Sequence, residues 1–158
     1  MNLPGLQVDR VHIHAGGRPT LNLPRVLLAD DHPALLQAEI DLLSAYFDVV
    51  GTAADGAALV AEAGRLHPDV IVTDISMPIL NGIDAVHKLQ ESGSTAKFVF
   101  VTVHSEGEFV DACMEVGVVG YVHKACIRHN LVPAIKAVLD GQSYVSRFDS
   151  HPSRKQAG

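Results

Sequence analysis

Five side chains that can carry charge or move protons stand directly after short apolar stretches of the sequence. They are an adjacent pair of carboxylates, a third carboxylate, a hydroxyl and an amine: Asp30, Asp31, Asp74, Thr102 and Lys124. Three carboxylates held close together repel one another unless a cation joins them. Lys124 supplies one positive charge, and a hard ion such as Mg²⁺ binds one or two carboxylates while leaving room for a phosphate oxygen. Such a set suits phosphoryl transfer in which a carboxylate is the nucleophile.

These side chains meet only if the apolar stretches are neighbouring strands of one sheet. Residues 70–72 are Val-Ile-Val, a β-branched run typical of a strand that is buried on both faces. Similar stretches at 26–29, 47–52, 98–101 and 118–122 alternate with helical patterns, the last of which we expect near Leu131 with Pro133 in its first turn. The alternation predicts an α/β protein with five parallel strands and helices on both faces. Ligands of such sheets bind outside the carboxyl ends of the strands, where all five side chains would lie.

Composition and charge set the limits of the domain and exclude several classes of protein. The chain has 158 residues, 47% of them hydrophobic and 19% charged, which is typical of a globular domain and not of a disordered chain. We expect a flexible leader over 1–23, one domain over 24–146 and a polar tail over 147–158. The net charge of −6 argues against direct contact with nucleic acid, and no apolar stretch is long enough to span a membrane. Without a signal peptide or a disulfide framework, the chain is expected in the cytoplasm.

The joint spacing of several short motifs resembles the receiver domain of two-component response regulators. It is most similar to the subfamily that usually carries a C-terminal helix-turn-helix of the LuxR type. Between Arg25 and Ser146 the matching segments are Asp30-Asp31-His32-Pro33, Asp74-Ile75-Ser76-Met77-Pro78, Asn81-Gly82, Thr102 and Gly120-Tyr121-Val122-His123-Lys124. The resemblance implies a flavodoxin-like (βα)5 fold, a doubly wound parallel sheet with strand order 2-1-3-4-5, which is one of the common orders of doubly wound sheets.

The resemblance also implies a role for each acidic residue. Asp74 would accept a phosphoryl group from a histidine kinase or a small phosphodonor. Asp31, Asp74 and the backbone carbonyl of Ser76 would bind Mg²⁺, and Asp30 would act through water or outer contacts. Lys124 would pair with one phosphoryl oxygen. The protein would therefore catalyse only its own phosphorylation and dephosphorylation, and would not be an enzyme in the usual sense.

Further residues would form a switch that reports phosphorylation. Thr102 would move toward the phosphoryl group and Tyr121 would rotate inward behind it. Ser76 and His104 occupy positions that tune the lifetime of the phosphoryl group in this family. For Tyr121 an ordinary core aromatic, and for His104 a solvated loop histidine, stay open as alternatives. The kinase would dock near the first helix, and phosphorylation would favour a homodimer through the fourth helix, fifth strand and fifth helix.

Other interpretations of the chain compete with this one. Only residues 147–158 follow Ser146, too few for a helix-turn-helix, so we expect either the receiver part of a longer transcription regulator or a single-domain receiver. A flavodoxin-like cofactor binder needs a loop rich in Gly, Ser or Thr after its first strand, and here residues 30–33 are acidic. A haloacid-dehalogenase-like phosphatase needs a second carboxylate two residues after the nucleophile, where this chain has Ser76. A receiver that is never phosphorylated is disfavoured by the complete set of site residues.

Overall fold

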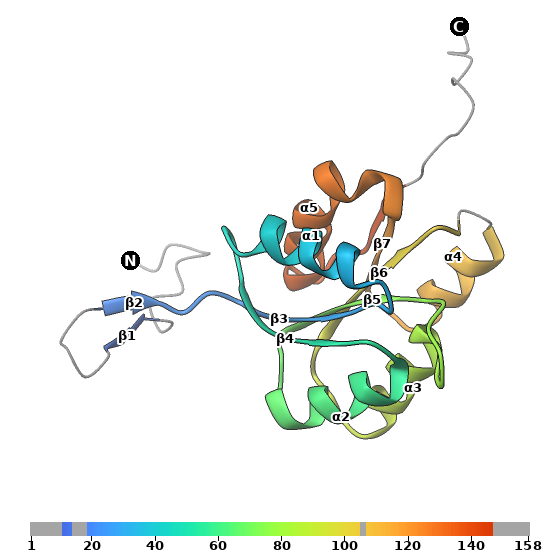
Figure 1. The fold of residues 1–158 in the computed structure, drawn as a ribbon, viewed down its shortest axis with the longest axis horizontal. Coiled ribbons are helices and arrows are strands. Elements are labelled where there is room, and N and C mark those ends of the chain that lie inside the picture. The colour runs from blue at the N-terminus through green and yellow to red at the C-terminus, as the bar shows by residue number, and fades with distance from the viewer. Residues whose placement is uncertain (1–10, 14–18, 105–106, 147–158) are drawn as a thin grey trace, which may run out of the picture.

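A six-stranded parallel sheet forms the centre of the protein (Figure 1). The computed structural model describes residues 11–13, 19–104 and 107–146. The strand order is β4-β3-β5-β6-β7-β8 and every neighbouring pair is parallel. The strands are β3 (Arg25–Ala29), β4 (Asp48–Ala53), β5 (Val70–Asp74), β6 (Lys97–Thr102), β7 (Val119–His123) and β8 (Tyr144–Ser146). The first five of these strands have the predicted order 2-1-3-4-5, and the α/β class is confirmed.

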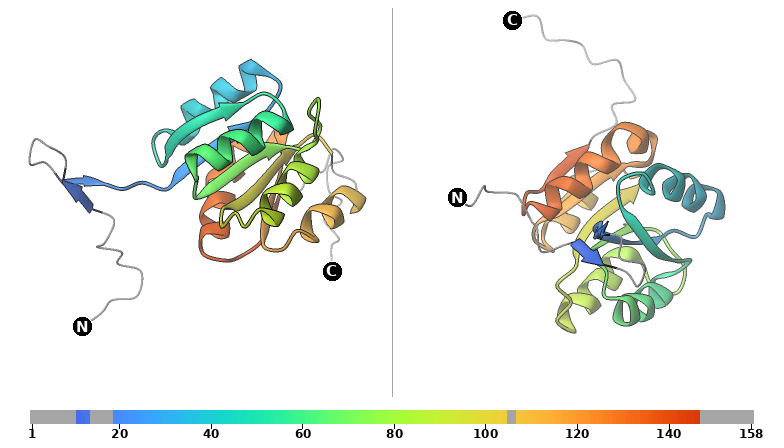
Figure 2. Two further views of the ribbon diagram at one scale, coloured as in Figure 1. Left: turned by 90° about the horizontal axis from the view of Figure 1, so that it is seen from below. Right: turned by 90° about the vertical axis from the view of Figure 1, so that its left-hand side faces the viewer.

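Five α-helices cover the two faces of this sheet. They are α1 (Pro33–Leu43), α2 (Gly56–Leu66), α3 (Gly82–Glu91), α4 (Gly107–Met114) and α5 (Ile127–Leu139). Figures 1 and 2 show α1 and α5 on one face, and α2, α3 and α4 on the other. Each helix connects two parallel strands, as a right-handed crossover connection requires.

The core is split into two layers by the alternation of side chains along each strand. Val26 and Leu28 of β3 face α1 and α5, while Leu27 and Ala29 face α2 and α3. Because both faces of the central strands are covered, successive residues of these strands are apolar, in place of an alternation of apolar and polar residues. β5 is buried throughout, from Val70 to Asp74. A carboxylate that ends this strand is therefore carried on a rigid support.

The structure differs from the sequence-based expectation in three places: the start of α5, the strand β8 and the pair β1–β2. α5 begins at Ile127 and not near Leu131, so Pro133 lies inside the helix. Proline has no N–H to donate to the carbonyl four residues before it. Because the side chain of Pro133 is exposed, this carbonyl lies on the solvent side of α5. A short strand, β8, extends the sheet beyond β7. In the predicted leader, β1 (Val11–Ile13) and β2 (Pro19–Leu21) form an antiparallel pair.

The domain limits remain predictions, and the predicted tail, residues 147–158, lies outside the described residues. Over the ranges that the structure describes, no helix combines the length and the apolar character needed to cross a bilayer.

Candidate functional site

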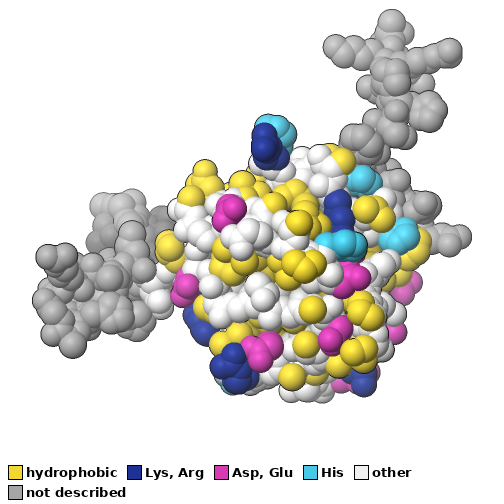
Figure 3. All heavy atoms as spheres, in the orientation of Figure 1, with side chains coloured by type: hydrophobic (Ala, Val, Ile, Leu, Met, Phe, Trp, Pro, Cys, Tyr) yellow, Lys and Arg dark blue, Asp and Glu magenta, His cyan; other side chains and the backbone are white. Residues whose placement is uncertain are grey.

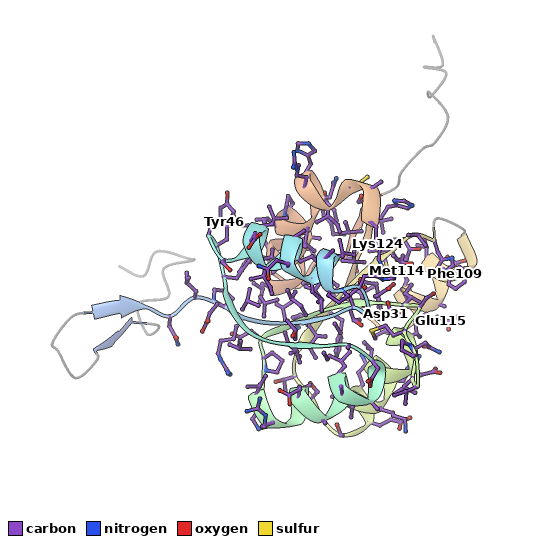
Figure 4. All side chains as sticks on the ribbon, viewed as in Figure 1. Asp31, Tyr46, Phe109, Met114, Glu115 and Lys124 are labelled. Atoms are coloured by element: carbon purple, nitrogen blue, oxygen red, sulfur yellow. The ribbon has the colours of Figure 1, made fainter. Side chains whose placement is uncertain are left out.

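The chemically active side chains lie along the carboxyl edge of the sheet. Asp30 follows β3 directly, Asp74 ends β5, Thr102 ends β6 and Lys124 follows β7. The register aligns these ends, because Ala29 pairs with Thr73, Asp74 with Val101, and Thr102 with His123. Figure 4 shows Asp31 and Lys124 at this edge, and Figure 3 shows acidic, basic and histidine side chains gathered on the same side of the molecule.

Lys124 links two of the carboxylates across the edge. Its Nζ donates a hydrogen bond to Asp74 Oδ2 at 3.0 Å and lies 3.0 Å from Asp30 Oδ2. Both carboxylates are almost fully buried, Asp30 with 1% and Asp74 with 4% of its surface exposed. A buried carboxylate costs free energy unless a partner of opposite charge compensates it. Lys124 is that partner for both carboxylates, which stand at the ends of two neighbouring strands.

Burial and charge act in opposite directions on these groups. Burial raises the pKa of Asp74, although the hydrogen bond and charge of Lys124 oppose the shift. For Lys124, burial lowers the pKa, but the carboxylates of Asp30 and Asp74 outweigh it and leave the pKa raised. The amine is therefore a firmly charged ammonium. It does not neutralise all the acids at this edge, because Asp31 adds a third carboxylate.

The three carboxylates carry more negative charge than Lys124 can balance, and a divalent ion would supply the positive charge that is missing. One ligand atom from each of Asp30, Asp31, His32 and Asp74 lies within 4.8 Å of the others. Asp30 Oδ2 is buried and makes no hydrogen bond, even though it lies beside the ammonium of Lys124. Carboxylate oxygens are the donors that hard cations prefer. This cluster can bind a metal ion.

Thr102, His104 and Tyr121 form a connected group beside the acids. Thr102 is fully buried, and its Oγ1 accepts a hydrogen bond from the backbone N–H of His104 at 3.1 Å. The hydroxyl of Tyr121 donates to the carbonyl oxygen of His104. Tyr121 is 1% exposed, so its ring already lies inside the fold. The backbone of the β6–α4 loop is thus held from two strands, β6 and β7.

The side chain of His104 connects the acidic edge to α4. Its Nε2 lies 3.1 Å from Ser76 Oγ, and the N–H of Ser76 donates to Asp74 Oδ1 at 3.3 Å. The imidazole also stacks on Phe109 of α4, with ring centroids 4.1 Å apart. Figure 4 labels Phe109 on α4 at this end of the molecule. His104 is therefore not a solvated loop histidine in this structure.

The structure brings the predicted residues to one edge and adds two that the sequence analysis missed. His32 belongs to a matching motif, yet its ring was given no role, and Nδ1 lies 3.0 Å from both Asp30 Oδ1 and Asp31 Oδ1. Glu39 of α1 is 2% exposed, and burial raises its pKa to about 8, with the charge of Asp30 adding to the shift. Its spacing from Leu36 and Leu43 was the available signal for a buried position.

Comparison with known proteins supports the same assignment. Residues 26–136 match the family model described as the response regulator receiver domain. The response regulator GacA of Pseudomonas viridiflava is 38% identical over 125 residues, which cover 77% of this chain and 58% of GacA. The isolated receiver domain of RcsB from Salmonella enterica serovar Typhimurium, solved with the phosphomimetic BeF3−, superposes with a TM-score of 0.72 at 25% identity. That match covers 79% of this chain and 94% of the RcsB domain.

A further similar structure contains two RcsB dimers bound to two parallel DNAs. It has a TM-score of 0.72 and 25% identity, and the match covers 79% of this chain and 65% of that one. The chain spans a little over half the length of the curated relatives it matches, 58% for GacA. The family model, the sheet order and the acidic pocket agree: the chain belongs to the response-regulator receiver domain family.

Proposed function

We propose that Asp74 accepts a phosphoryl group and that the domain switches conformation in response. The observation that carries this proposal is the shared contact of Lys124 with Asp74 and Asp30 at the carboxyl edge. An Asp74 carboxylate oxygen attacks phosphorus, and a P–O bond forms as the P–N bond to the donor imidazole breaks. The electron pair of the broken bond stays on the imidazole nitrogen. Lys124 then pairs with one phosphoryl oxygen, and the hydroxyl of Thr102 with another.

Mg²⁺ is the ion we propose for the acidic cluster. Asp31, Asp74 and the backbone carbonyl of Ser76 would hold it, with Asp30 acting through water. When bound, the ion neutralises negative charge on the acids and on the incoming phosphoryl oxygens. The chain's own contribution is to fix Asp74 on a buried strand and to keep Lys124 charged within reach of it.

Mass spectrometry of the intact protein tests the acceptor. Mg²⁺ and a small phosphodonor such as acetyl phosphate or phosphoramidate should add the mass of one phosphoryl group. Asp74→Asn should abolish the gain, while Asp140→Asn, at an exposed aspartate at the end of α5, should leave it unchanged. A gain that survives Asp74→Asn contradicts the assignment. Fast multiple turnover of a phosphate ester would instead favour a phosphatase.

The loop around His104 is the proposed switch. The N–H of His104 donates to Thr102 Oγ1, and Tyr121 holds the carbonyl of His104. We expect movement of Thr102 toward the phosphoryl group to pull on this hydrogen bond. Movement of Thr102 therefore changes the loop that leads into α4. Because Tyr121 is already buried, we place its role in holding the loop and not in a rotation from solvent. The pair Ser76 and His104 stands beside Asp74, and we expect it to limit access of water to the phosphoryl group.

A groove between α1 and α5 supports the proposed kinase site. It has a volume of about 640 Å³, and its lining is apolar with charged residues at the rim: Leu35, Ala38, Asp41, Leu42, Lys124, Ala125, Ile127 and Arg128. Since Lys124 belongs to both the groove and the acidic edge, a kinase docked here would lie next to Asp74. We place this docking in the cytoplasm, and the free thiols of Cys113 and Cys126 agree with a reducing compartment.

The output is proposed from the relatives. One similar structure contains RcsB dimers bound to DNA, and the relatives include the transcriptional regulatory protein MctR of Rhizobium johnstonii, of which the match covers 58%. We infer that phosphorylation favours a homodimer through α4, β7 and α5, and that this chain controls transcription without contacting DNA itself. Size-exclusion chromatography with and without BeF3− and Mg²⁺ tests the first part. An elution volume that does not change with BeF3− contradicts it.

A further inference from the structure

The imidazole of His123 connects the turn that carries Lys124 to the neighbouring β6–α4 loop. Its Nε2 lies 3.0 Å from the carbonyl oxygen of Val103, and its Nδ1 accepts a hydrogen bond from the N–H of Ala125 at 3.0 Å. His123 ends β7 and pairs there with Thr102, the last residue of β6. One half-buried ring therefore holds backbone atoms of two separate loops.

These two partners require a single form of the ring. A carbonyl oxygen only accepts hydrogen bonds, so Nε2 must carry a proton to bond to Val103. A backbone N–H only donates, so Nδ1 must be without a proton to bond to Ala125. Both contacts are made together only by the neutral imidazole with its proton on Nε2.

The hydrogen bond at Nδ1 lies next to the amine of the acidic edge. Lys124 and Ala125 belong to η2 (Lys124–Cys126), a short 3-10 helix, and the side chain of His123 caps its amino end. Such a cap satisfies an N–H that has no partner inside the helix and fixes how the chain enters it. From this turn Lys124 places its Nζ 3.0 Å from one carboxylate oxygen of Asp30 and 3.0 Å from one of Asp74. The direction in which Lys124 leaves the backbone therefore depends on the cap.

The other end of the ring is fixed to the loop that we propose as the switch. Tyr121 and His123 are two residues apart on β7, so their side chains leave the same face of the strand. They hold the carbonyls of two successive loop residues, because Tyr121 donates to His104 and His123 contacts Val103. The cap on the Lys124 turn is thus anchored on the backbone of the β6–α4 loop.

We propose that His123 is a positioning residue for the phosphorylation of Asp74, because its neutral ring ties the Lys124 turn to the β6–α4 loop and keeps the ammonium on the acidic edge. This inference rests on the proposed function, since it assigns a further residue to the same reaction. His123 acts through Lys124. A misplacement of about 1 Å in an active site can cost about a hundredfold in rate, so the two hydrogen bonds that fix this turn matter for the reaction.

Nuclear magnetic resonance of the ¹⁵N-labelled full chain tests the form of the ring. The two-bond ¹H–¹⁵N couplings of an imidazole distinguish a proton on Nε2 from a proton on Nδ1. The signals of His123 are identified by their absence from the spectrum of His123→Asn. We expect the form with the proton on Nε2. The other form, or the averaged pattern of a ring that exchanges between the two, overturns the proposal.

Rates of phosphorylation test what the ring does. His123→Leu removes both hydrogen bonds, His123→Asn keeps an acceptor near the place of Nδ1, and His123→Gln keeps a donor near the place of Nε2. With Mg²⁺ and phosphoramidate, we expect His123→Leu to gain the phosphoryl mass at least about tenfold more slowly than the wild type, and the two amide variants to lie in between. His129→Leu, at an exposed histidine of α5, is the control and should keep the wild-type rate. A wild-type rate in His123→Leu overturns the proposal.

The ¹⁵N signal of the Lys124 ammonium distinguishes positioning from a general loss of structure. This signal is identified by its absence from Lys124→Met. We expect it to shift or broaden in His123→Leu and His123→Gln, which lose the cap, and to stay unchanged in His129→Leu. If His123→Leu does not fold, His123→Gln carries the same comparison. An unchanged Lys124 signal in a variant that is phosphorylated slowly overturns the positioning role.

The same measurements separate this inference from the one on which it rests. If the Lys124 signal responds to His123→Gln but no protein gains a phosphoryl group, the positioning of Lys124 stands and the proposed function fails. If the wild type gains the group and His123→Leu gains it equally fast, the proposed function stands and the role of His123 fails.

Discussion

Lys124 is the residue on which the acidic edge depends most directly. It contacts Asp30 and Asp74 at 3.0 Å each and is itself only 15% exposed. Removing one member of a buried ion pair leaves the other charge without compensation, which typically costs more than the pair itself contributes. In this site the removal would leave two buried carboxylates facing each other. The stability of the metal-free protein should therefore depend on this one amine.

We expect Lys124→Met to lower the free energy of unfolding by about 3 kcal/mol in buffer that contains EDTA. Mg²⁺ should restore part of the loss, because it supplies positive charge to the same acids. Urea unfolding followed by circular dichroism measures both effects. Lys88→Met, which removes an exposed amine of α3, is the matched control and should change little. Equal losses in the two variants would show that the amine of Lys124 does not stabilise the acidic edge.

Glu39 adds a pH dependence of stability of its own to that of the acidic edge. Burial raises its pKa from 4.5 to about 8 in the folded protein, the charge of Asp30 adds to the shift, and Lys124 opposes it. Above pH 4.5 the unfolded chain releases this proton while the folded chain keeps it. Stability therefore falls as pH rises toward 8, by about 1.4 kcal/mol per pH unit at most.

Glu39→Gln should remove this contribution, since the amide does not ionise. In EDTA we expect the difference in unfolding free energy between the variant and the wild type to grow from pH 5 to pH 8 in favour of the variant. Urea titrations at several pH values measure this difference. Asp74 is present in both proteins, so its own contribution to the pH dependence cancels when one unfolding free energy is subtracted from the other. Glu91→Gln, at an exposed residue at the end of α3, should give a constant difference. A constant difference for Glu39→Gln would refute the assignment.

At the scale of elements, the start of α3 positions the loop that follows Asp74. The N–H of Gly82 donates to the carbonyl of Ile75 at 2.8 Å. A Cβ atom on Gly82 would lie 2.0 Å from the carbonyl oxygen of Asp74, a backbone atom that cannot move without shifting the carboxylate. Glycine is required here by this close approach. The helix and the end of β5 are thus fitted to each other at one point.

Gly82→Ala should lower the free energy of unfolding by about 2 to 3 kcal/mol and reduce phosphorylation of Asp74. The physical reason is the displacement of Asp74 by the new methyl group. Gly64→Ala is the matched control, because nothing lies within 4 Å of a Cβ at this position in α2. There the change should stabilise the protein by up to about 1 kcal/mol, as expected for alanine in a helix. Thermal melts and the mass assay measure both variants, and similar effects at the two positions would contradict the argument.

The elements that the sequence predicted are those with a strong local pattern. The β-branched run of β5 is long enough to indicate a buried strand, and the alternation with helices indicates a parallel sheet. The strand order followed only from the resemblance to the receiver family. β8 has three residues, too few for a period, and it forms only by pairing with β7. The first turn of α5 carries Arg128 and Asn130, which show no apolar pattern. Such elements are determined by tertiary contacts and not by local sequence.

The site residues also fall into those whose position the sequence predicts and those that depend on tertiary contacts. That Asp30, Asp74 and Lys124 meet at one edge follows from the strand ends alone. The direction of the His32 ring does not, because it depends on how the start of α1 meets the acidic pair. Glu39 was missed because a charged residue in a helix is expected on the exposed face. Sequence predicts where a side chain is attached more readily than where it points.

At the scale of the whole molecule, the metal-free fold carries unbalanced charge at one edge. The chain has a net charge of −6, and three of its carboxylates gather there beside a single amine, Lys124, which contacts Asp30 and Asp74. An ion that binds only the folded state stabilises the whole domain by mass action. Because Asp30 and Asp31 directly follow β3 and Asp74 ends β5, one bound ion would link the ends of two neighbouring strands at the centre of the sheet.

Mg²⁺ should therefore raise the free energy of unfolding by about 2.7 kcal/mol at a concentration one hundred times its dissociation constant. The gain should shrink as pH falls, since burial raises the pKa of Asp74 and its proton then competes with the ion. Urea unfolding with and without Mg²⁺, at pH 8 and at pH 5, measures this. Asp31→Asn should lose most of the gain, whereas Asp111→Asn, at an exposed residue of α4, should keep it. A gain that is the same in both variants would place the ion elsewhere on the acidic surface and remove the charge argument for the site.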